Sequence, residues 1–296
     1  MQMFMARVRN VLADGLMLFV LPLSIALLPW TLGFRLLKWV ARRESVYRLA
    51  VDPAWEAAKR HLGDHDEREW KTRFRLLRLV DHVDVYLTLL RGQSWRARNI
   101  DEAGSWPAPG ACVFLTYHWG AGNWIWPRLR ERGFDACFVM QRPRGRSHGL
   151  TRLSHWFAHL RVWCMRRAGS GGVVFTGGSS GEVAATLHGG RSVVGMLDLP
   201  ARAEQRSEQV ELLGERVKIP SGLARIAAEN DAPIALFSMG LDFENGRRDL
   251  RVEPLPANLS VQQIAERYAA HLDARLRAAP EAWQIWREAP AMFIAR

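Results

Sequence analysis

The strongest constraint on the fold is an alternation of short apolar runs with longer segments of helical periodicity, which begins near residue 111 and continues to residue 279. The apolar runs have the length and composition of strands, and they cover 111–116, 134–140, 191–199 and 232–241. Helical segments lie between and after them, at 123–132, 150–168, 179–188, from Ser221 onward and at 260–279. Strands that alternate with helices predict an α/β domain.

Residues 44–100 carry apolar positions at helical spacing within a polar background, so we expect helices there. One of these helices should bury a stripe made of Leu76, Leu79, Val80 and Val83. The helix at 260–279 should likewise face inward with Ile264, Leu272 and Leu276. Both segments are therefore predicted to pack against a core.

Two local patterns predict where elements turn or begin. The stretch VELLGERVKI, at 210–219, predicts a hairpin that turns at Gly214 and Glu215. Ser179 and Glu182 have the spacing of a capping box, which predicts the start of a helix.

Near the N-terminus, 20 residues from Gly15 to Phe34 carry no charge. A helix of about that length spans a bilayer core. Arginines precede the run, and arginines and a lysine follow it. Pro22 and Pro29 argue against a straight helix, because each removes a backbone donor. A kinked span and a helix lying in the interface both fit, and both predict an N-terminal membrane anchor at 1–43 followed by one domain at 44–296.

The composition predicts an acidic partner. The formal net charge is +11, which favours contact with nucleic acid, an anionic membrane surface or an acidic carrier protein. Between Asp135 and Glu182 the chain has no acidic residue, and it has seven arginines, at positions 142, 144, 146, 152, 161, 166 and 167. Such a window predicts an anion site. Together with the anchor, it favours a phosphorylated lipid or an acidic carrier over nucleic acid.

Three further groups of residues are interpreted as structural. The cysteines Cys112, Cys137 and Cys164 lie in apolar runs at wide spacing, which predicts buried free thiols. His61, with Asp64 and His65, is interpreted as part of a solvated charged segment, so we predict no metal site. The glycine-rich stretch GSGGVVFTGGSSGE lacks a phosphate-binding signature and predicts a flexible connection.

His118 is the candidate catalytic residue. It follows the predicted strand at 111–116 and precedes the predicted helix at 123–132, in a loop of the kind that carries function. The start of a helix also favours negative charge developing nearby. Asn123 stands five residues later in the stretch YHWGAGNW.

The chain resembles the late acyltransferases of lipid A biosynthesis, the lauroyl and myristoyl transferases of the wider lysophospholipid acyltransferase superfamily. An apolar N-terminal segment is followed, in order, by YHWGAGNW, QRPRG, TLHGGRSVVGMLD, VELLGERVKIPSGLARIAAENDAPIA and PEAWQIW. These stretches are similar to the His-x4-acid motif, the Arg-Pro segment, the strand-end aspartate, the Pro and Ala-rich segment and the C-terminal Pro-Glu-x-Trp-x-Trp of that family. The resemblance covers nearly the whole chain and implies a mixed central sheet flanked by helices.

The resemblance also implies roles for five residues. His118 corresponds to the general base, and Asn123 stands where the family has its carboxylate. Arg142, Arg167 (with Arg166 as a near alternative) and Asp198 correspond to substrate-binding positions. An amide can orient the imidazole through its carbonyl oxygen, although it supplies no charge. We therefore expect Asn123 to be the partner of His118.

The implied function is transfer of an acyl group at the cytoplasmic face of the inner membrane, without a cofactor. The donor is an acyl carrier protein or acyl-CoA, and the acceptor is a lipid hydroxyl, by resemblance that of a lipid A precursor. Another hydroxylated lipid or a polyene-type product is an alternative acceptor. A lipid-binding protein that has lost catalysis is an alternative from a different class. We expect no nucleic-acid partner.

Overall fold

The computed structural model describes residues 11–141, 151–169, 171–202 and 204–294. Its centre is a seven-stranded mixed sheet with the strand order β1-β9-β8-β2-β5-β3-β4. Neighbouring strands are parallel except β8 and β9, which are antiparallel. The predicted α/β class, with a mixed sheet flanked by helices, is confirmed.

The strands of this sheet are β1 (Ile100–Gly104), β2 (Val113–Thr116), β3 (Ala136–Met140), β4 (Val173–Phe175), β5 (Ser192–Met196), β8 (Ile234–Leu241) and β9 (Arg248–Pro254). Every residue of β2 and β8 is buried, as expected for central strands covered on both faces. Three strands of the sheet, β1, β4 and β9, were not predicted. β1 is an edge strand in which only Ile100 is buried, and β4 is a short strand inside the glycine-rich stretch. In β9, charged residues alternate with apolar ones.

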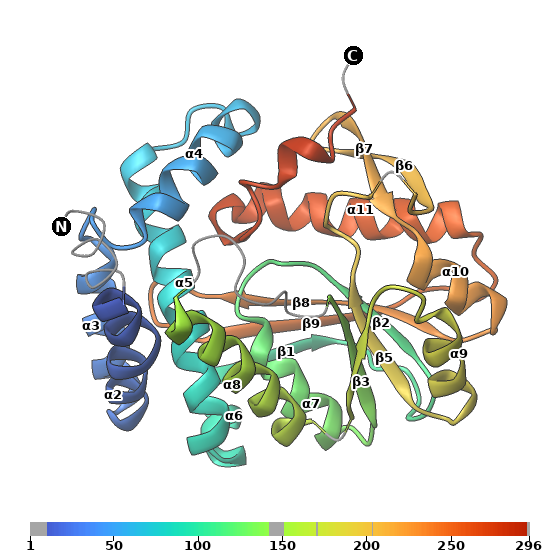
Figure 1. The fold of residues 1–296 in the computed structure, drawn as a ribbon, viewed down its shortest axis with the longest axis horizontal. Coiled ribbons are helices and arrows are strands. Elements are labelled where there is room, and N and C mark those ends of the chain that lie inside the picture. Colours follow the sequence, from blue (N-terminus) through green and yellow to red (C-terminus); the bar gives the residue numbers. More distant parts are fainter. Residues whose placement is uncertain (1–10, 142–150, 170, 203, 295–296) are drawn as a thin grey trace.

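Helices cover both faces of the sheet, with α11 above it and α7 and α8 below it in Figure 1. The longer helices are α4 (Arg48–Leu62), α5 (Glu67–Leu90), α8 (Arg152–Ala168) and α11 (Val261–Ala278). The shorter ones are α6 (Gln93–Asn99), α7 (Ile125–Glu131), α9 (Ser180–His188), α10 (Gly222–Glu229) and the single turns η2 (Gly122–Trp124), η3 (Pro280–Ala282) and η4 (Ala289–Ala291). The predicted inward stripes of α5 and α11 are confirmed, because all their named residues are buried.

The predicted N-terminal membrane helix is not found as one element. The charge-free run is divided into η1 (Gly15–Val20), α2 (Leu21–Leu27) and the first part of α3 (Trp30–Ala41). Helix α2 ends where Leu28 adopts an extended conformation, as expected for the residue before a proline. Within the described residues, no helix is long and apolar enough to cross a membrane.

These N-terminal helices fold back against α5, and their buried residues belong to the main core. Arg91, which follows α5, donates to the carbonyls of Ala26 and Leu28 at 2.8 and 2.7 Å. The hydroxyl of Tyr86 donates to the Leu18 carbonyl at 2.7 Å. The reversal after α2 is therefore held by Arg91 at the end of α5, and a domain boundary at residue 43 stays a prediction.

Several local predictions can be compared with the structure. The hairpin forms from β6 (Ser207–Leu212) and β7 (Glu215–Pro220), with its turn at Leu213 and Gly214, one residue earlier than predicted. Helix α9 begins where expected, but the Ser179 side chain makes no capping hydrogen bond, so the capping-box prediction is wrong. The three cysteines are buried and free, as predicted.

The prediction of a solvated segment is wrong for His61. Its side chain is stacked between the rings of Trp286 and Phe293, and its Nδ1 lies 3.2 Å from a carboxylate oxygen of Glu215. His61 therefore joins α4 to the C-terminal segment. Asp64 and His65 are exposed, as expected.

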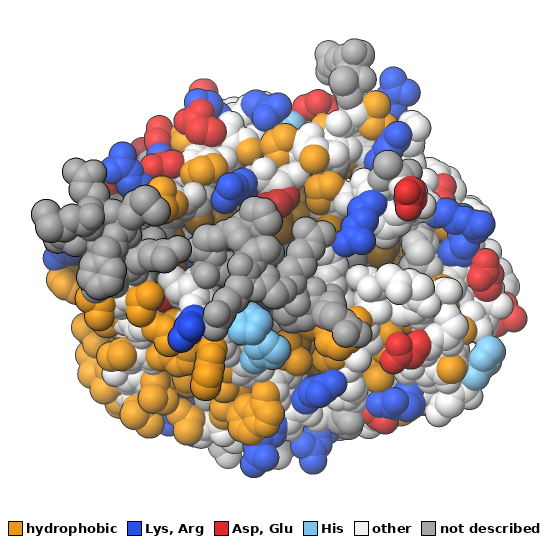
Figure 2. Space-filling model, in the orientation of Figure 1, with side chains coloured by type: hydrophobic (Ala, Val, Ile, Leu, Met, Phe, Trp, Pro, Cys, Tyr) orange, Lys and Arg blue, Asp and Glu red, His pale blue; other side chains and the backbone are white. Residues whose placement is uncertain are grey.

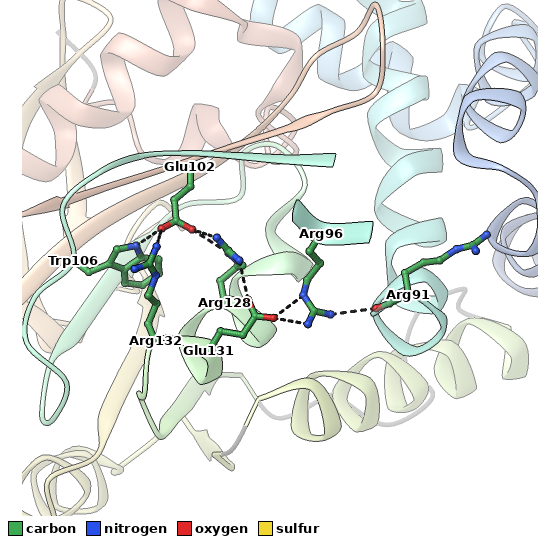
Figure 3. A network of polar contacts seen from close by, with 7 residues as sticks. All are labelled: Arg91, Arg96, Glu102, Trp106, Arg128, Glu131 and Arg132. Atoms are coloured by element: carbon green, nitrogen blue, oxygen red, sulfur yellow. Dashed lines mark hydrogen bonds and ion pairs between the residues drawn. The ribbon is translucent and has the colours of Figure 1, made fainter. Parts of the chain in front are cut away.

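A polar network joins α6, β1 and α7 below the sheet (Figure 3). Glu102 of β1 accepts hydrogen bonds from Trp106, Arg128 and Arg132, and Glu131 of α7 accepts from Arg96 and Arg128. The arginines in this region are thus neutralised by carboxylates from neighbouring elements.

Candidate active site

The candidate site lies where two neighbouring parallel strands end. His118 is the second residue after β2, and Asp198 is the second residue after β5. Because β2 and β5 are paired in parallel, their carboxyl ends meet at one edge of the sheet. Ligands of open α/β sheets bind outside this edge. The topology therefore brings together two residues that are 80 positions apart.

Asp198 holds both the side chain and the backbone of His118. The imidazole Nδ1–H donates to Asp198 Oδ1 at 2.9 Å, and the His118 backbone N–H donates to Oδ2 at 2.7 Å. The indole Nε1–H of Trp283 donates to the same Oδ2 at 2.8 Å. Asp198 is fully buried, whereas the His118 side chain keeps 31% of its surface exposed. The Nε2 nitrogen is left as the proton acceptor of the ring.

This environment sets the pKa of His118. Burial lowers the pKa of the imidazole, but the charge of Asp198 and its hydrogen bond raise it by more. Arg161 opposes this increase to a smaller extent. The net pKa of His118 is above its ordinary value, so the site stabilises an imidazolium.

The C-terminal PEAWQIW segment clamps the His118 loop. The Gln284 backbone N–H donates to the His118 carbonyl at 2.7 Å, and its side chain donates to the Gly120 carbonyl at 2.9 Å. The Gly120 N–H donates in turn to the Ala282 carbonyl at 2.9 Å. Since Trp283 also binds Asp198, this one segment fixes both members of the pair.

Gly120 is required by the conformation of the loop. Its φ is +74°, and a Cβ atom at this position would lie 1.8 Å from the carbonyl oxygen of Met239 in β8. The Ala121 N–H donates to that same oxygen at 2.8 Å. Only a residue without a side chain allows the loop to pass this close to β8 while taking a left-handed conformation.

A groove of about 1120 Å³ opens beside His118. It lies between the ends of β3, β4 and β5 and the N-terminal turns of α9 and α10. Apolar side chains dominate its wall: Phe138, Val139, Met140, Val183, Met196, Leu197, Leu199, Leu223 and Ile226. Polar groups come from Gln141, the Thr176–Ser180 loop, Arg202, Glu204 and Gln205.

Gly195 allows one wall of this groove to form. A Cβ atom on Gly195 would lie 2.0 Å from a terminal methyl of Leu223, which is one of the groove residues. Leu223 of α10 therefore rests directly on the backbone of β5. The glycine and the leucine together bring α10 against the sheet at the edge where His118 lies.

Asn123 does not take the position that the sequence predicted. It is buried, and its amide nitrogen donates to the Asp81 carbonyl of α5 at 3.2 Å. The Nδ1 of His118 is bound by Asp198 instead. The carboxylate beside the imidazole thus comes from the end of another strand.

The predicted anion site is only partly described. Arg142, Arg144 and Arg146 lie outside the described residues. The prediction that these arginines lack a balancing carboxylate is wrong for Arg161 of α8. Its guanidinium binds both carboxylate oxygens of Asp81, at 2.5 and 2.8 Å. Arg167 is exposed in the last turn of α8, with its guanidinium 5.7 Å from the centre of the Trp163 ring. Among the described arginines, Arg202 is the one that lines the groove.

Sequence reasoning missed the residues that support the pair. Trp283 was noted only as part of a motif, and nothing in the sequence indicates that its indole binds Asp198. Tyr268 of α11 joins the two strand ends, since its hydroxyl donates to the Thr116 carbonyl at 2.7 Å and accepts from the Leu197 N–H at 3.1 Å. The sequence did place this tyrosine on the inward stripe of α11, where a buried hydroxyl needs a hydrogen-bond partner.

No protein-family model matches the chain, and no curated protein matches it in sequence. The resemblance stated above therefore rests on motifs alone. What the fold and site define is an α/β protein with a His–Asp pair at the carboxyl edge of its sheet, beside a largely apolar groove.

Proposed function

We propose that the protein is an acyltransferase that moves a fatty acyl group from a thioester donor to a hydroxyl of a lipid acceptor. The observation that carries the proposal is the His118–Asp198 pair at the head of an apolar groove. A buried carboxylate that orients a partly exposed imidazole is the arrangement of a general base. The adjoining apolar wall suits a hydrocarbon chain.

In this mechanism, Nε2 of His118 removes the proton from the acceptor hydroxyl as its oxygen attacks the thioester carbonyl carbon. The new C–O bond forms and a tetrahedral oxyanion results. The C–S bond then breaks, and the imidazolium returns its proton to the departing sulfur. Asp198 keeps Nδ1 protonated and stabilises the imidazolium between the two proton transfers.

The donor and the acceptor follow from the sequence resemblance and the charge of the chain. A net charge of +11 suits an acidic acyl carrier protein, with acyl-CoA as the alternative donor. The acceptor by resemblance is a lipid A precursor, and another hydroxylated lipid or a polyene-type product is the alternative. The protein would then act at the cytoplasmic face of the inner membrane, with the N-terminal helices at the interface.

The proposal is tested by incubating the purified full-length protein with isotope-labelled acyl–acyl carrier protein and a lipid extract, followed by mass spectrometry of the lipids. Acyl transfer that depends on His118 supports the proposal and identifies the acceptor. Binding of lipid without any transfer of the labelled acyl group would contradict it, and would favour a lipid-binding protein. Arg130→Ala, on the exposed side of α7, serves as a matched surface control.

A further inference from the structure

Large hydrophobic side chains are exposed in only a few parts of the described chain. Apart from Val11, Leu12 and Leu49, they define a surface that we call the apolar face: Leu16, Val20, Leu23, Leu27, Leu32, Leu36, Trp39, Leu89, Leu90, Trp156 and Trp163. These residues come from the N-terminal helices, the end of α5 and α8. Figure 2 shows hydrophobic side chains gathered over α2 and α3 at the lower left of the molecule. A patch this extensive on a folded protein marks an interaction site.

The elements that carry the apolar face are fixed to one another. Helix α8 contacts η1 through the rings of Phe157 and Phe19, whose centres are 5.8 Å apart. Ser154, in the first turn of α8, donates to a carboxylate oxygen of Asp14 at 2.8 Å. The end of α5 is joined to the α2 reversal by Arg91. The three regions of the sequence that carry the apolar face are therefore packed against one another.

Helix α8 contributes a stripe that packing inside the protein does not explain. Trp156 and Trp163 are seven residues apart, so they lie on the same side of the helix, and they are 71% and 51% exposed. The neighbouring stripe of α8 is buried through Phe157 and Cys164. Two exposed tryptophans on one helical stripe are typical of a helix that meets the headgroup region of a bilayer.

The charges around the apolar face indicate the kind of partner. Residues 15–43 and helix α8 contain no acidic residue. The exposed arginines there are Arg35, Arg42, Arg43, Arg152, Arg166 and Arg167. Arg43 lies over the ring of Trp39 at 4.5 Å, which keeps a cation beside an exposed indole. By contrast, Arg96, Arg128 and Arg132 in Figure 3 are neutralised by Glu102 and Glu131.

We propose that the apolar face docks on the surface of an anionic phospholipid bilayer, with Trp156 and Trp163 of α8 as a second contact beside the N-terminal helices. Apolar side chains would enter the interface, and the surrounding arginines would meet lipid phosphates. The proposal rests on the membrane-borne acceptor of the proposed function, but on no step of the chemistry. Arg161 of α8 contacts Asp81 next to Asn123, so docking through α8 places the His118 loop close to the bilayer.

The test is sedimentation of the purified full-length protein with vesicles of phosphatidylcholine, with and without phosphatidylglycerol. We expect binding that requires the anionic lipid and weakens as salt rises. The double variant Trp156→Ser, Trp163→Ser should bind at least about tenfold more weakly, because the burial of each indole is lost. Leu49→Ser, which removes an exposed hydrophobic residue outside the apolar face, is the matched control and should bind as wild type does.

His118→Ala separates this inference from the proposed function. It should bind vesicles as the wild type does even if acyl transfer is abolished. Vesicle binding can therefore be measured independently of acyl transfer. Two outcomes would overturn the inference. One is vesicle binding by the double tryptophan variant that equals wild type. The other is self-association of the wild type that disappears in that variant, which would show that a second copy covers the apolar face.

Discussion

Two carboxylates in this protein are equally buried, yet their surroundings differ. Asp198 and Asp84 have no exposed side-chain surface, and each binds one cationic or basic partner. The partner of Asp198 is His118, which is partly exposed at the groove. The partner of Asp84 is Arg248, which is fully buried. The two pairs therefore differ in the exposure of the partner.

The Asp84–Arg248 pair is enclosed by tryptophans. The Arg248 guanidinium lies 4.2 Å from the ring centre of Trp30 and 5.5 Å from that of Trp95. Burial raises the pKa of Asp84 to about 6 despite the charge of Arg248. Since Trp30 begins α3, this pair joins the N-terminal helices to α5 and β9 and has no route to a ligand.

The largest expected effect is the loss of transfer in His118→Ala. Removing the proton acceptor should lower the rate by about 10²–10⁴, the usual contribution of a positioned general base. The urea denaturation midpoint should change little, because the ring is partly exposed. Initial rates with acyl–acyl carrier protein measure the first effect. A variant that transfers at the wild-type rate would make His118 structural.

For the buried Asp84–Arg248 pair, substitution should lower the stability of the protein. Arg248→Met leaves Asp84 buried without its cation, and we expect a loss of about 3–5 kcal/mol in the free energy of unfolding. The double variant Asp84→Leu, Arg248→Met should recover much of that loss, because it also removes the buried charge. Urea denaturation of the two variants provides the comparison. Equal stability of Arg248→Met and wild type would remove the distinction between the two pairs.

A carboxylate at position 123 should harm the protein. The amide of Asn123 donates to the Asp81 carbonyl, and an aspartate there would place an acceptor against an acceptor. We expect Asn123→Asp to lose about 1–3 kcal/mol in the free energy of unfolding, without any gain in transfer rate. Asn123→Ala, which adds no charge, is the control. Faster transfer by Asn123→Asp would indicate that position 123, not Asp198, is where the imidazole needs its partner.

The two tryptophans of the C-terminal motif offer a finer comparison, because both are fully buried and each donates one hydrogen bond. Trp283 donates to Asp198, whereas Trp286 donates to the Pro280 carbonyl at 2.7 Å. Both Trp→Phe variants should lose stability. Only Trp283→Phe should also change the pH profile of transfer, with a change in rate of about tenfold or less. Identical pH profiles would show that the indole of Trp283 supports only the fold.

The sequence predicted the elements whose signal is local. Helices α5 and α11 follow from periodicity and strands β2, β3, β5 and β8 from short apolar runs, and the motifs indicated His118 and Asp198 as site residues. The edge strand β1 was missed because it is mostly exposed and has no apolar run, and β9 was missed because charged residues alternate with its apolar ones. Strand β4 was missed because glycines surround its three residues.

The partners of the site residues could not be predicted, because they depend on which strand ends are adjacent. Asp198 reaches His118 through the pairing of β5 with β2, and Arg161 reaches Asp81 through the packing of α8 on α5. Each of these contacts joins residues 80 positions apart. The motif placed Asn123 beside His118 in the sequence, but the backbone of η2 turns its amide toward α5.

The central claim is that Asp198, and not the residue at position 123, orients the imidazole of His118 and stabilises its protonated form. The direct test is the pKa of His118, measured by NMR titration of isotope-labelled imidazoles and assigned with a His118→Gln variant. The wild-type pKa should lie above about 6.5, because Asp198 stabilises the protonated ring more than burial destabilises it. In Asp198→Asn, burial and Arg161 remain without that charge, so the pKa should fall below the ordinary value, while Asn123→Ala should leave it unchanged. A pKa that stays constant in Asp198→Asn but moves in Asn123→Ala would contradict the account.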